Sequence, residues 1–144
     1  MKMRLAVCLL AALAQGALAQ DKPEPILPDQ LQWAGDPNGA QNVMVVGAAD
    51  KAGLYQQRVR MPAGAKIQPH THPDERISVV LEGTIYVGFG ETFDESSVVA
   101  VPTGAVYVAP AGVPHYVWAK DGPALYQEGG IGPTGAAFIP QPAQ

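Results

Sequence analysis

Cysteine is almost absent from this sequence. The 144 residues include one cysteine, Cys8, which lies in an apolar stretch at Leu5–Leu13. A short basic start precedes this stretch, and the small residues Ala17-Leu18-Ala19 follow it, as in the segments that signal peptidase cleaves. The stretch is too short for a membrane-spanning helix, which needs roughly 20 apolar residues. We therefore expect residues 1–20 to be a signal peptide and the mature protein to be exported, either periplasmic or secreted.

Removal of this segment leaves no cysteine and few basic residues. The mature chain would have neither disulfides nor thiol chemistry, so its stability must come from packing. Seven basic residues would face 13 acidic ones, a net charge of −6. Nucleic acids and anionic membranes bind proteins through basic patches. We therefore expect no nucleic acid partner, and no membrane partner after signal cleavage.

Helical periodicity is also missing, because no window shows a sustained 3.6-residue period. From residue 42 onward, Gly and Pro recur roughly every eight to twelve residues between short β-branched runs. This spacing is typical of a sandwich or barrel of short antiparallel strands. We predict a proline-rich N-terminal arm at 21–41, with Trp33 able to dock on the domain, and one domain at 42–140. The predicted strands cover 43–47, 54–61, 76–81, 84–89, 98–101, 106–109, 115–119, 125–128 and 136–139.

Histidine is scarce and concentrated in two similar segments. The chain has three histidines, His70, His72 and His115. The first two are two residues apart in a segment that reads as a strand, where alternate side chains point to one face. The third lies in a second strand, turn and strand segment. This distribution predicts that the two segments meet around a metal ion.

Two spaced motifs surround these histidines. The first contains Gly64, five residues, His70-Thr71-His72 and Gly83, and matches G-x5-H-x-H-x3or4-E-x6-G. The second matches G-x5-P-x-G-x2-H-x3-N at Gly104, Pro110, Gly112 and His115. The sequence therefore resembles the cupin superfamily (RmlC-like jelly rolls), in particular small exported bacterial single-domain cupins of unsettled activity.

The resemblance implies an all-β fold, a small double-stranded β-helix (jelly-roll) barrel with a metal near its mouth. It implies that His70, His72 and His115 bind a divalent transition metal, Fe, Mn, Zn, Ni or Cu. It further implies a small-molecule ligand or substrate and a homodimer. The identity of the metal and of the substrate is left open by the sequence.

One motif position departs from the family pattern. Arg76 stands where the metal-binding glutamate is usual, and Glu75 lies one residue earlier. In a regular strand Arg76 points inward and Glu75 outward, whereas a bulge near Asp74 would turn Glu75 toward the histidines. Three arrangements follow: a three-histidine site with Arg76 set back to bind an acidic substrate, a site completed by Glu75, or a cupin without a metal.

Two functions are compatible with these residues. The first is an enzyme that acts on a small acidic or oxygenated organic molecule, in a dioxygenase-like or isomerase-like reaction. Arg76 would orient the substrate, as an arginine does in cupin thiol dioxygenases with three histidines, and Tyr86 or Tyr107 would donate a proton. The alternative is a non-catalytic cupin that binds or senses a small ligand, with a degenerate or absent metal site.

Overall fold

The computed structural model describes residues 24–141, so the expected signal peptide lies outside the described residues. Within this range the chain forms strands and one 3-10 turn but no α-helix, and no helix long and apolar enough to cross a membrane. The elements are η1 (Pro28–Gln30), β1 (Ala34–Gly35), β2 (Gln41–Val46), β3 (Gly53–Met61), β4 (Lys66–Thr71), β5 (Arg76–Glu82), β6 (Thr84–Phe89), β7 (Val99–Pro102), β8 (Val106–Ala109), β9 (His115–Trp118), β10 (Ala124–Gly132) and β11 (Ala137–Phe138).

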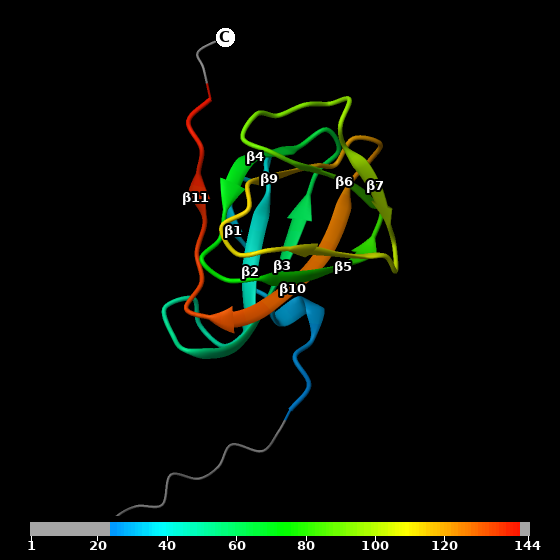
Figure 1. Ribbon diagram of the computed structural model, residues 1–144. Helices are drawn as coiled ribbons and strands as arrows, with labels where there is room; N and C mark the ends of the chain where they lie inside the picture. Colours follow the sequence, from blue (N-terminus) through cyan, green and yellow to red (C-terminus); the bar gives the residue numbers. More distant parts are fainter. Residues whose placement is uncertain (1–23, 142–144) are drawn as a thin grey trace, which may run out of the picture.

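The strands form two antiparallel sheets that enclose one interior (Figure 1). The six-stranded sheet has the order β1-β2-β3-β10-β5-β8, and the five-stranded sheet has the order β11-β4-β9-β6-β7. Strands from distant parts of the sequence are neighbours in both sheets, for example β10 between β3 and β5. The predicted all-β jelly-roll fold is confirmed.

Part of the expected arm contributes to the barrel. β1 lies within the range 21–41 and pairs with β2, with Ala34 opposite Asn42. The guanidinium carbon of Arg60 on β3 lies 4.4 Å from the ring centroid of Trp33. A cation–π contact of this kind fastens the described part of the arm to the six-stranded sheet.

The motif glycines occupy turns that other residues adopt with strain. Gly64, Gly83, Gly104 and Gly112 all have positive φ, between +71° and +85°. At Gly83, which joins β5 to β6, an added Cβ would also lie 2.3 Å from the carbonyl oxygen of Pro123. Glycine is therefore required there both for the backbone conformation and for the close approach of another segment.

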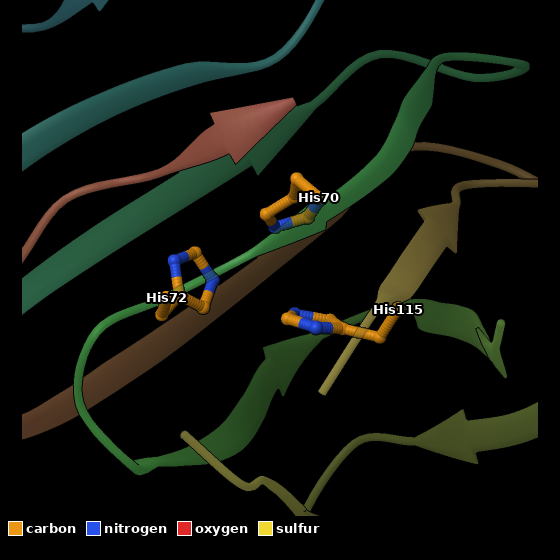
Figure 2. Close-up of side chains that lie close together, drawn as sticks. All are labelled: His70, His72 and His115. Carbon is orange, nitrogen blue, oxygen red and sulfur yellow. The ribbon is translucent and has the colours of Figure 1, made fainter. Parts of the chain in front are cut away.

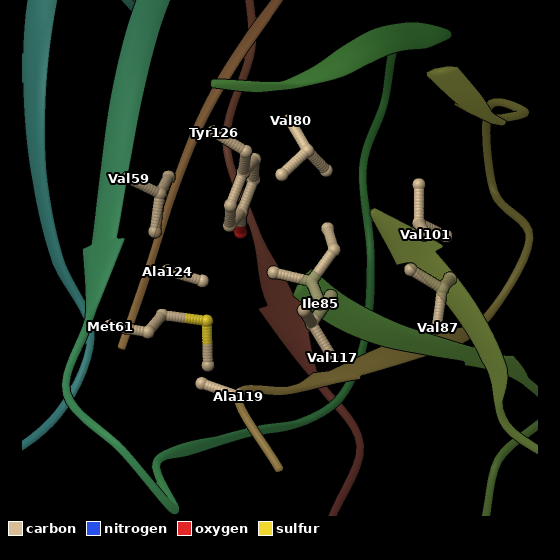
Figure 3. Close-up of a cluster of buried hydrophobic side chains, with 10 residues drawn as sticks. All are labelled: Val59, Met61, Val80, Ile85, Val87, Val101, Val117, Ala119, Ala124 and Tyr126. Carbon is tan, nitrogen blue, oxygen red and sulfur yellow. The ribbon is translucent and has the colours of Figure 1, made fainter. Parts of the chain in front are cut away.

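One end of the interior is apolar (Figure 3). The buried side chains of this cluster come from both sheets and are Val59, Met61, Val80, Ile85, Val87, Val101, Val117, Ala119, Ala124 and Tyr126. Each strand contributes alternate residues, because successive side chains of a strand point to opposite faces. Burial of this apolar area is the main source of stability for a chain that lacks disulfides.

The other end of the interior is polar, and the change occurs at the same level in neighbouring strands. Along β10 the inward residues run from Ala124 and Tyr126 to Glu128. The register places Glu128 directly opposite Gln57 of β3 and Ser78 of β5. All three side chains are buried, so the strand pairing itself assembles a polar layer above the apolar cluster.

Candidate metal centre

The strand register brings the two histidine segments together. His70 on β4 and His115 on β9 are direct Cα partners in the antiparallel pair, and His72 follows β4 by one residue. Opposite residues of an antiparallel pair have Cβ atoms about 5 Å apart. The three rings therefore converge, as Figure 2 shows, with centroid separations of 4.7 Å (His70 to His72), 4.4 Å (His70 to His115) and 5.0 Å (His72 to His115).

Backbone carbonyls fix the same tautomer in all three rings. Nδ1 of His70 donates to the carbonyl of Gln68 at 2.8 Å, and Nδ1 of His72 donates to the carbonyl of Gly135 at 2.6 Å. Nδ1 of His115 donates to the carbonyl of Val113 at 3.2 Å. Since a carbonyl only accepts, each Nδ1 carries the proton, and each Nε2 keeps a free lone pair. This is the arrangement of imidazoles that bind metal ions.

Burial keeps the imidazoles neutral. It lowers the pKa of His72 to about 4, and the positive charges of Arg76 and His70 act in the same direction. Burial also lowers the pKa of His115 to about 4 and lowers that of His70. The three rings are thus deprotonated at neutral pH, which metal ligation requires.

This donor set fits a transition metal ion. One ligand atom from each of the three histidines lies within 4.8 Å of the other two. Ligands bound at about 2.1 Å lie within about 4.2 Å of one another, so only a small inward shift of the rings separates this arrangement from coordination. Neutral imidazoles suit Zn, Cu, Fe and Ni. His70, His72 and His115 are therefore the residues that would hold the ion.

Arg76 points inward, as the strand alternation predicts, but its charge is balanced within the protein. Its Nη1 donates to Oε1 of Glu128 at 2.7 Å, and its Nη2 donates to Oγ1 of Thr134 at 2.7 Å and to the carbonyl of Gly135 at 2.9 Å. Both side chains of the ion pair are about 95% buried, with exposures of 5% and 6%. The anion closest to Arg76 is thus Glu128, and Oδ1 of Asp74 lies 3.9 Å from its Nε, so carboxylates of the chain itself make an arginine tolerable beside a cation site.

Glu128 is the site residue that the sequence motifs did not indicate. Its Oε1 accepts hydrogen bonds from Arg76 and from Nε2 of Gln57 at 2.6 Å, and its Oε2 accepts one long bond from Oγ of Ser78 at 3.3 Å. The only available signal was its place two residues after Tyr126, on the inward side of an alternating strand.

A hydrogen-bond network links this pair to the histidines. The carbonyl of Gly135 accepts from both Arg76 and His72. Thr134 donates to Asp74 at 2.6 Å, and Asp74 also accepts from the hydroxyl of Tyr55 at 2.5 Å. Burial, together with the bond to Asp74, raises the pKa of Tyr55 to about 12. Arg76 thus helps to orient His72 through a shared acceptor.

Glu75 and Tyr86 lie away from the cluster. Glu75 is exposed and lines a groove on the outer face of the six-stranded sheet. Asp74 and Glu75 lie in the bend between β4 and β5, and β5 pairs with β8 from Arg76 onward without a bulge that would turn Glu75 inward. The irregularity in this region lies earlier, between Ile67 and His70. Tyr86 points outward from β6, and its hydroxyl donates to Asp121. The structure therefore does not bring either residue to the three histidines.

A cavity of about 310 Å³ connects the histidines with the polar layer. Glu128, Arg76 and the phenols of Tyr107 and Tyr126 line it together with the three histidines, and apolar side chains complete its walls. Burial raises the pKa of both tyrosines, so they stay protonated. The volume is at the lower end of the range for small-molecule sites.

Comparison with known proteins gives a consistent assignment. The family model described as "Cupin domain" matches residues 57–126. Germin-like protein subfamily T member 2 of Arabidopsis thaliana is 31% identical over 87 residues, which is 57% of this chain and 40% of that protein. The chain thus spans less than half the length of the curated relatives it matches.

Solved structures share the fold at low sequence identity. KdgF from Halomonas sp. is 21% identical, with a TM-score of 0.61 over 76% of this chain and 94% of that chain. Salicylate 1,2-dioxygenase from Pseudoaminobacter salicylatoxidans is 17% identical, with a TM-score of 0.59 over 72% of this chain and 30% of that chain. The family match assigns residues 57–126 to the cupin domain family, and the solved structures share the fold of this chain.

Proposed function

We propose that this chain is a metal-dependent enzyme that acts on a small oxygenated organic molecule. The observation that carries the proposal is the convergence of three neutral imidazoles, with their Nε2 atoms free, on a small cavity lined by a buried carboxylate. A bound divalent transition metal, Fe, Mn, Zn, Ni or Cu, would supply Lewis acidity or, for the redox-active ions, oxygen activation.

The residues of the chain would divide the remaining tasks. His70, His72 and His115 would hold the ion and leave coordination positions open, because a three-ligand set does not saturate a transition metal. Glu128 would accept a hydrogen bond or a proton from the substrate, while Arg76 and Gln57 fix the carboxylate in place. The apolar walls would exclude water from the reacting groups.

The class of reaction is proposed as dioxygenase-like or isomerase-like. Salicylate 1,2-dioxygenase, one of the structural neighbours, performs oxygen chemistry on the same fold. This likeness supports only the fold, because one fold serves many chemistries. The lack of an unpaired arginine in the cavity favours the oxygenated substrate over the acidic one that Arg76 had suggested.

The second candidate function is non-catalytic binding or sensing of a small ligand. It is favoured by one observation, that Arg76 stands at the position of the usual fourth metal ligand and leaves three protein ligands. A binding protein would bind a ligand and release it unchanged, so the presence of turnover separates the two functions.

We further propose export and a homodimer. Export is supported by the signal-peptide pattern of residues 1–20. The homodimer is supported by an exposed apolar face on the six-stranded sheet, where Leu54 lies opposite Ile131 and Ile77 lies opposite Val108. Replacement of both Ile77 and Ile131 by Lys should convert a dimer into a monomer in light scattering, and a monomeric wild-type protein would refute the dimer.

The proposed enzymatic activity is tested by screening candidate substrates with protein that has been stripped of metal and reloaded. Metal-stripped protein is loaded in parallel with Fe, Mn, Zn, Ni or Cu and incubated aerobically with small diols, enediols, phenols and hydroxy acids. Mass spectrometry and oxygen uptake then report turnover. Turnover that is lost on metal removal and in His115→Ala would support the enzyme, whereas binding of a ligand without turnover in all five metal forms would favour the second candidate.

A further inference from the structure

The buried ion pair determines which ligands the cavity can accept. Nη1 of Arg76 is bound to Glu128, and Nη2 is bound to Thr134 and Gly135. The Nε–H group is buried and has no hydrogen-bond partner among the described residues, but Oδ1 of Asp74 lies 3.9 Å from Nε, so the guanidinium is flanked by two carboxylates of the protein. An anionic ligand would therefore find no unpaired cation among the cavity-lining side chains and would enter beside the carboxylate of Glu128.

Glu128 keeps unused capacity to accept hydrogen bonds. Among residues 24–141, two donors form short bonds to its Oε1, whereas Oε2 accepts a single long bond, from Ser78 at 3.3 Å. Each carboxylate oxygen has two lone pairs, and a buried acceptor with a free lone pair is stabilised by a donor. The carboxylate is 94% buried and lines the cavity, so a ligand inside the cavity can supply that donor.

The other walls suit an uncharged carbon skeleton. Val59, Ile67 and Val117 line the cavity as apolar side chains. At its edge, the Phe138 ring lies 5.3 Å from the ring of His70 and is 61% exposed, so an apolar surface flanks the histidines. Protonated Tyr107 adds a hydroxyl group on the same side of the interior as Glu128.

We propose that the cavity binds small uncharged molecules that carry at least two hydroxyl groups, such as diols, enediols or phenols, and that Glu128 selects them. One ligand oxygen is directed toward the three Nε2 atoms, and a second hydroxyl donates to Oε2 of Glu128. The contact of the ligand at the histidines rests on the proposed function, because it requires a bound metal. The selection by Glu128 does not require the metal and also holds for metal-free protein. Glu128 is thus a specificity-determining residue, and Arg76 and Gln57 position it.

The test compares two probes of similar size, neutral catechol and anionic salicylate. Calorimetry measures both dissociation constants on zinc-loaded and on metal-stripped protein, since zinc is redox-inert. We expect catechol to bind wild-type protein at least about tenfold more tightly than salicylate. Glu128→Gln should weaken catechol binding by about 10- to 100-fold, the usual effect of a hydrogen bond to a charged group. It should strengthen salicylate binding because Arg76 loses the nearer of its two carboxylate partners, and Asp74 remains at 3.9 Å.

Two further variants distinguish the loss of the Glu128 contact from misfolding of the protein. Glu82→Gln removes an exposed carboxylate at the end of β5 and should leave both constants unchanged. The double variant Arg76→Met/Glu128→Gln removes both charges of the ion pair together, so neither partner is left as an unpaired ion, and Asp74 keeps its hydrogen bonds from Tyr55 and Thr134. This variant should bind catechol and salicylate with about equal affinity.

Three results would overturn the proposal: tighter binding of salicylate than of catechol by wild-type protein, unchanged preference in Glu128→Gln, or no binding of either probe to zinc-loaded protein. Zinc content is measured on the same samples. Protein that binds no zinc but prefers catechol through Glu128 would refute the metal site alone, whereas protein that binds zinc without this preference would refute the role of Glu128 alone.

Discussion

Removal of one member of the Arg76–Glu128 pair should destabilise the fold far more than removal of an exposed ion pair. The two side chains are 5% and 6% exposed and are joined at 2.7 Å. Loss of one partner leaves an unpaired buried charge, which typically costs about 3–5 kcal/mol. Glu128→Gln should lie near the lower value, because Nη2 of Arg76 keeps its bonds to Thr134 and Gly135 and its Nε stays 3.9 Å from the carboxylate of Asp74.

A double-mutant cycle isolates the pair. Arg76→Met, Glu128→Gln and the double variant are compared with wild type by urea unfolding of metal-free protein at pH 7.5. The double variant should cost less than the sum of the single variants, with a coupling of about 2–3 kcal/mol. The control cycle uses Lys66 and Glu95, whose side chains are 32% and 58% exposed and joined at 2.5 Å.

The control pair should give a coupling of about 0.2–1 kcal/mol, because solvent screens an exposed pair. If the coupling of Arg76 with Glu128 were no larger than this control value, the inference that Glu128 is the anion that balances Arg76 would be refuted. Equal coupling energies in the two cycles would also remove the electrostatic reason for which the cavity should select uncharged ligands.

Three other predictions follow from burial and close contacts. The folded-state pKa values of His72 and His115 are about 4, below the value of 6.5 expected in the unfolded chain, so the unfolded state binds more protons between pH 4 and pH 6.5. The free energy of unfolding of metal-free protein, measured by urea unfolding, should therefore rise with pH across that window. The rise should be smaller in the variant with alanine at all three histidines, and an equal dependence on pH in wild type and this variant would refute the lowered pKa values. Gly88→Ala should destabilise the fold by about 1–3 kcal/mol, because the new Cβ would lie 2.2 Å from the Tyr116 ring. The control Gly122→Ala, whose Cβ would have no atom within 4 Å, should change stability by less than about 0.5 kcal/mol. Equal shifts of the melting temperature in the two variants would argue against the packing of Tyr116 on Gly88. Tyr86→Phe should leave zinc content and catechol affinity within about twofold of wild type, because the Tyr86 hydroxyl donates to Asp121 outside the cavity. A decrease of catechol affinity by tenfold or more would show that Tyr86 takes part in the site.

Much of this architecture was predictable because strands have a strict period. The predicted strands at 84–89 and 106–109 coincide with β6 and β8, and the inward orientation of Arg76 followed from its distance to Gly83. The same alternation in β6 buries Ile85 and Val87 and so turns Tyr86 outward, which the sequence interpretation did not apply to that residue. The strand of two residues at Ala34–Gly35 was missed because so short a segment has no period.

The sequence alone indicated the three histidines of the cluster, but it did not indicate the ion pair of Arg76 with Glu128. The two motifs indicated His70, His72 and His115, and pairing of β4 with β9 brought them together. Glu128 was missed because its role depends on the register of β10 against β3 and β5, which periodicity within one strand does not specify. An alternating pattern shows which side a residue faces but not which residues it meets there.

Metal stoichiometry shows whether the three histidines bind one metal ion. Protein without residues 1–20 is prepared as wild type, as Glu75→Gln and as the double variant His70→Ala/His115→Ala. Each is incubated with zinc, freed of excess metal and analysed by elemental mass spectrometry. We expect about one zinc per chain in wild type and in Glu75→Gln, and close to none in the double variant, since one histidine cannot hold the ion alone. Wild-type protein that binds no zinc, or a double variant that still binds it, would show that the three histidines do not form the metal site.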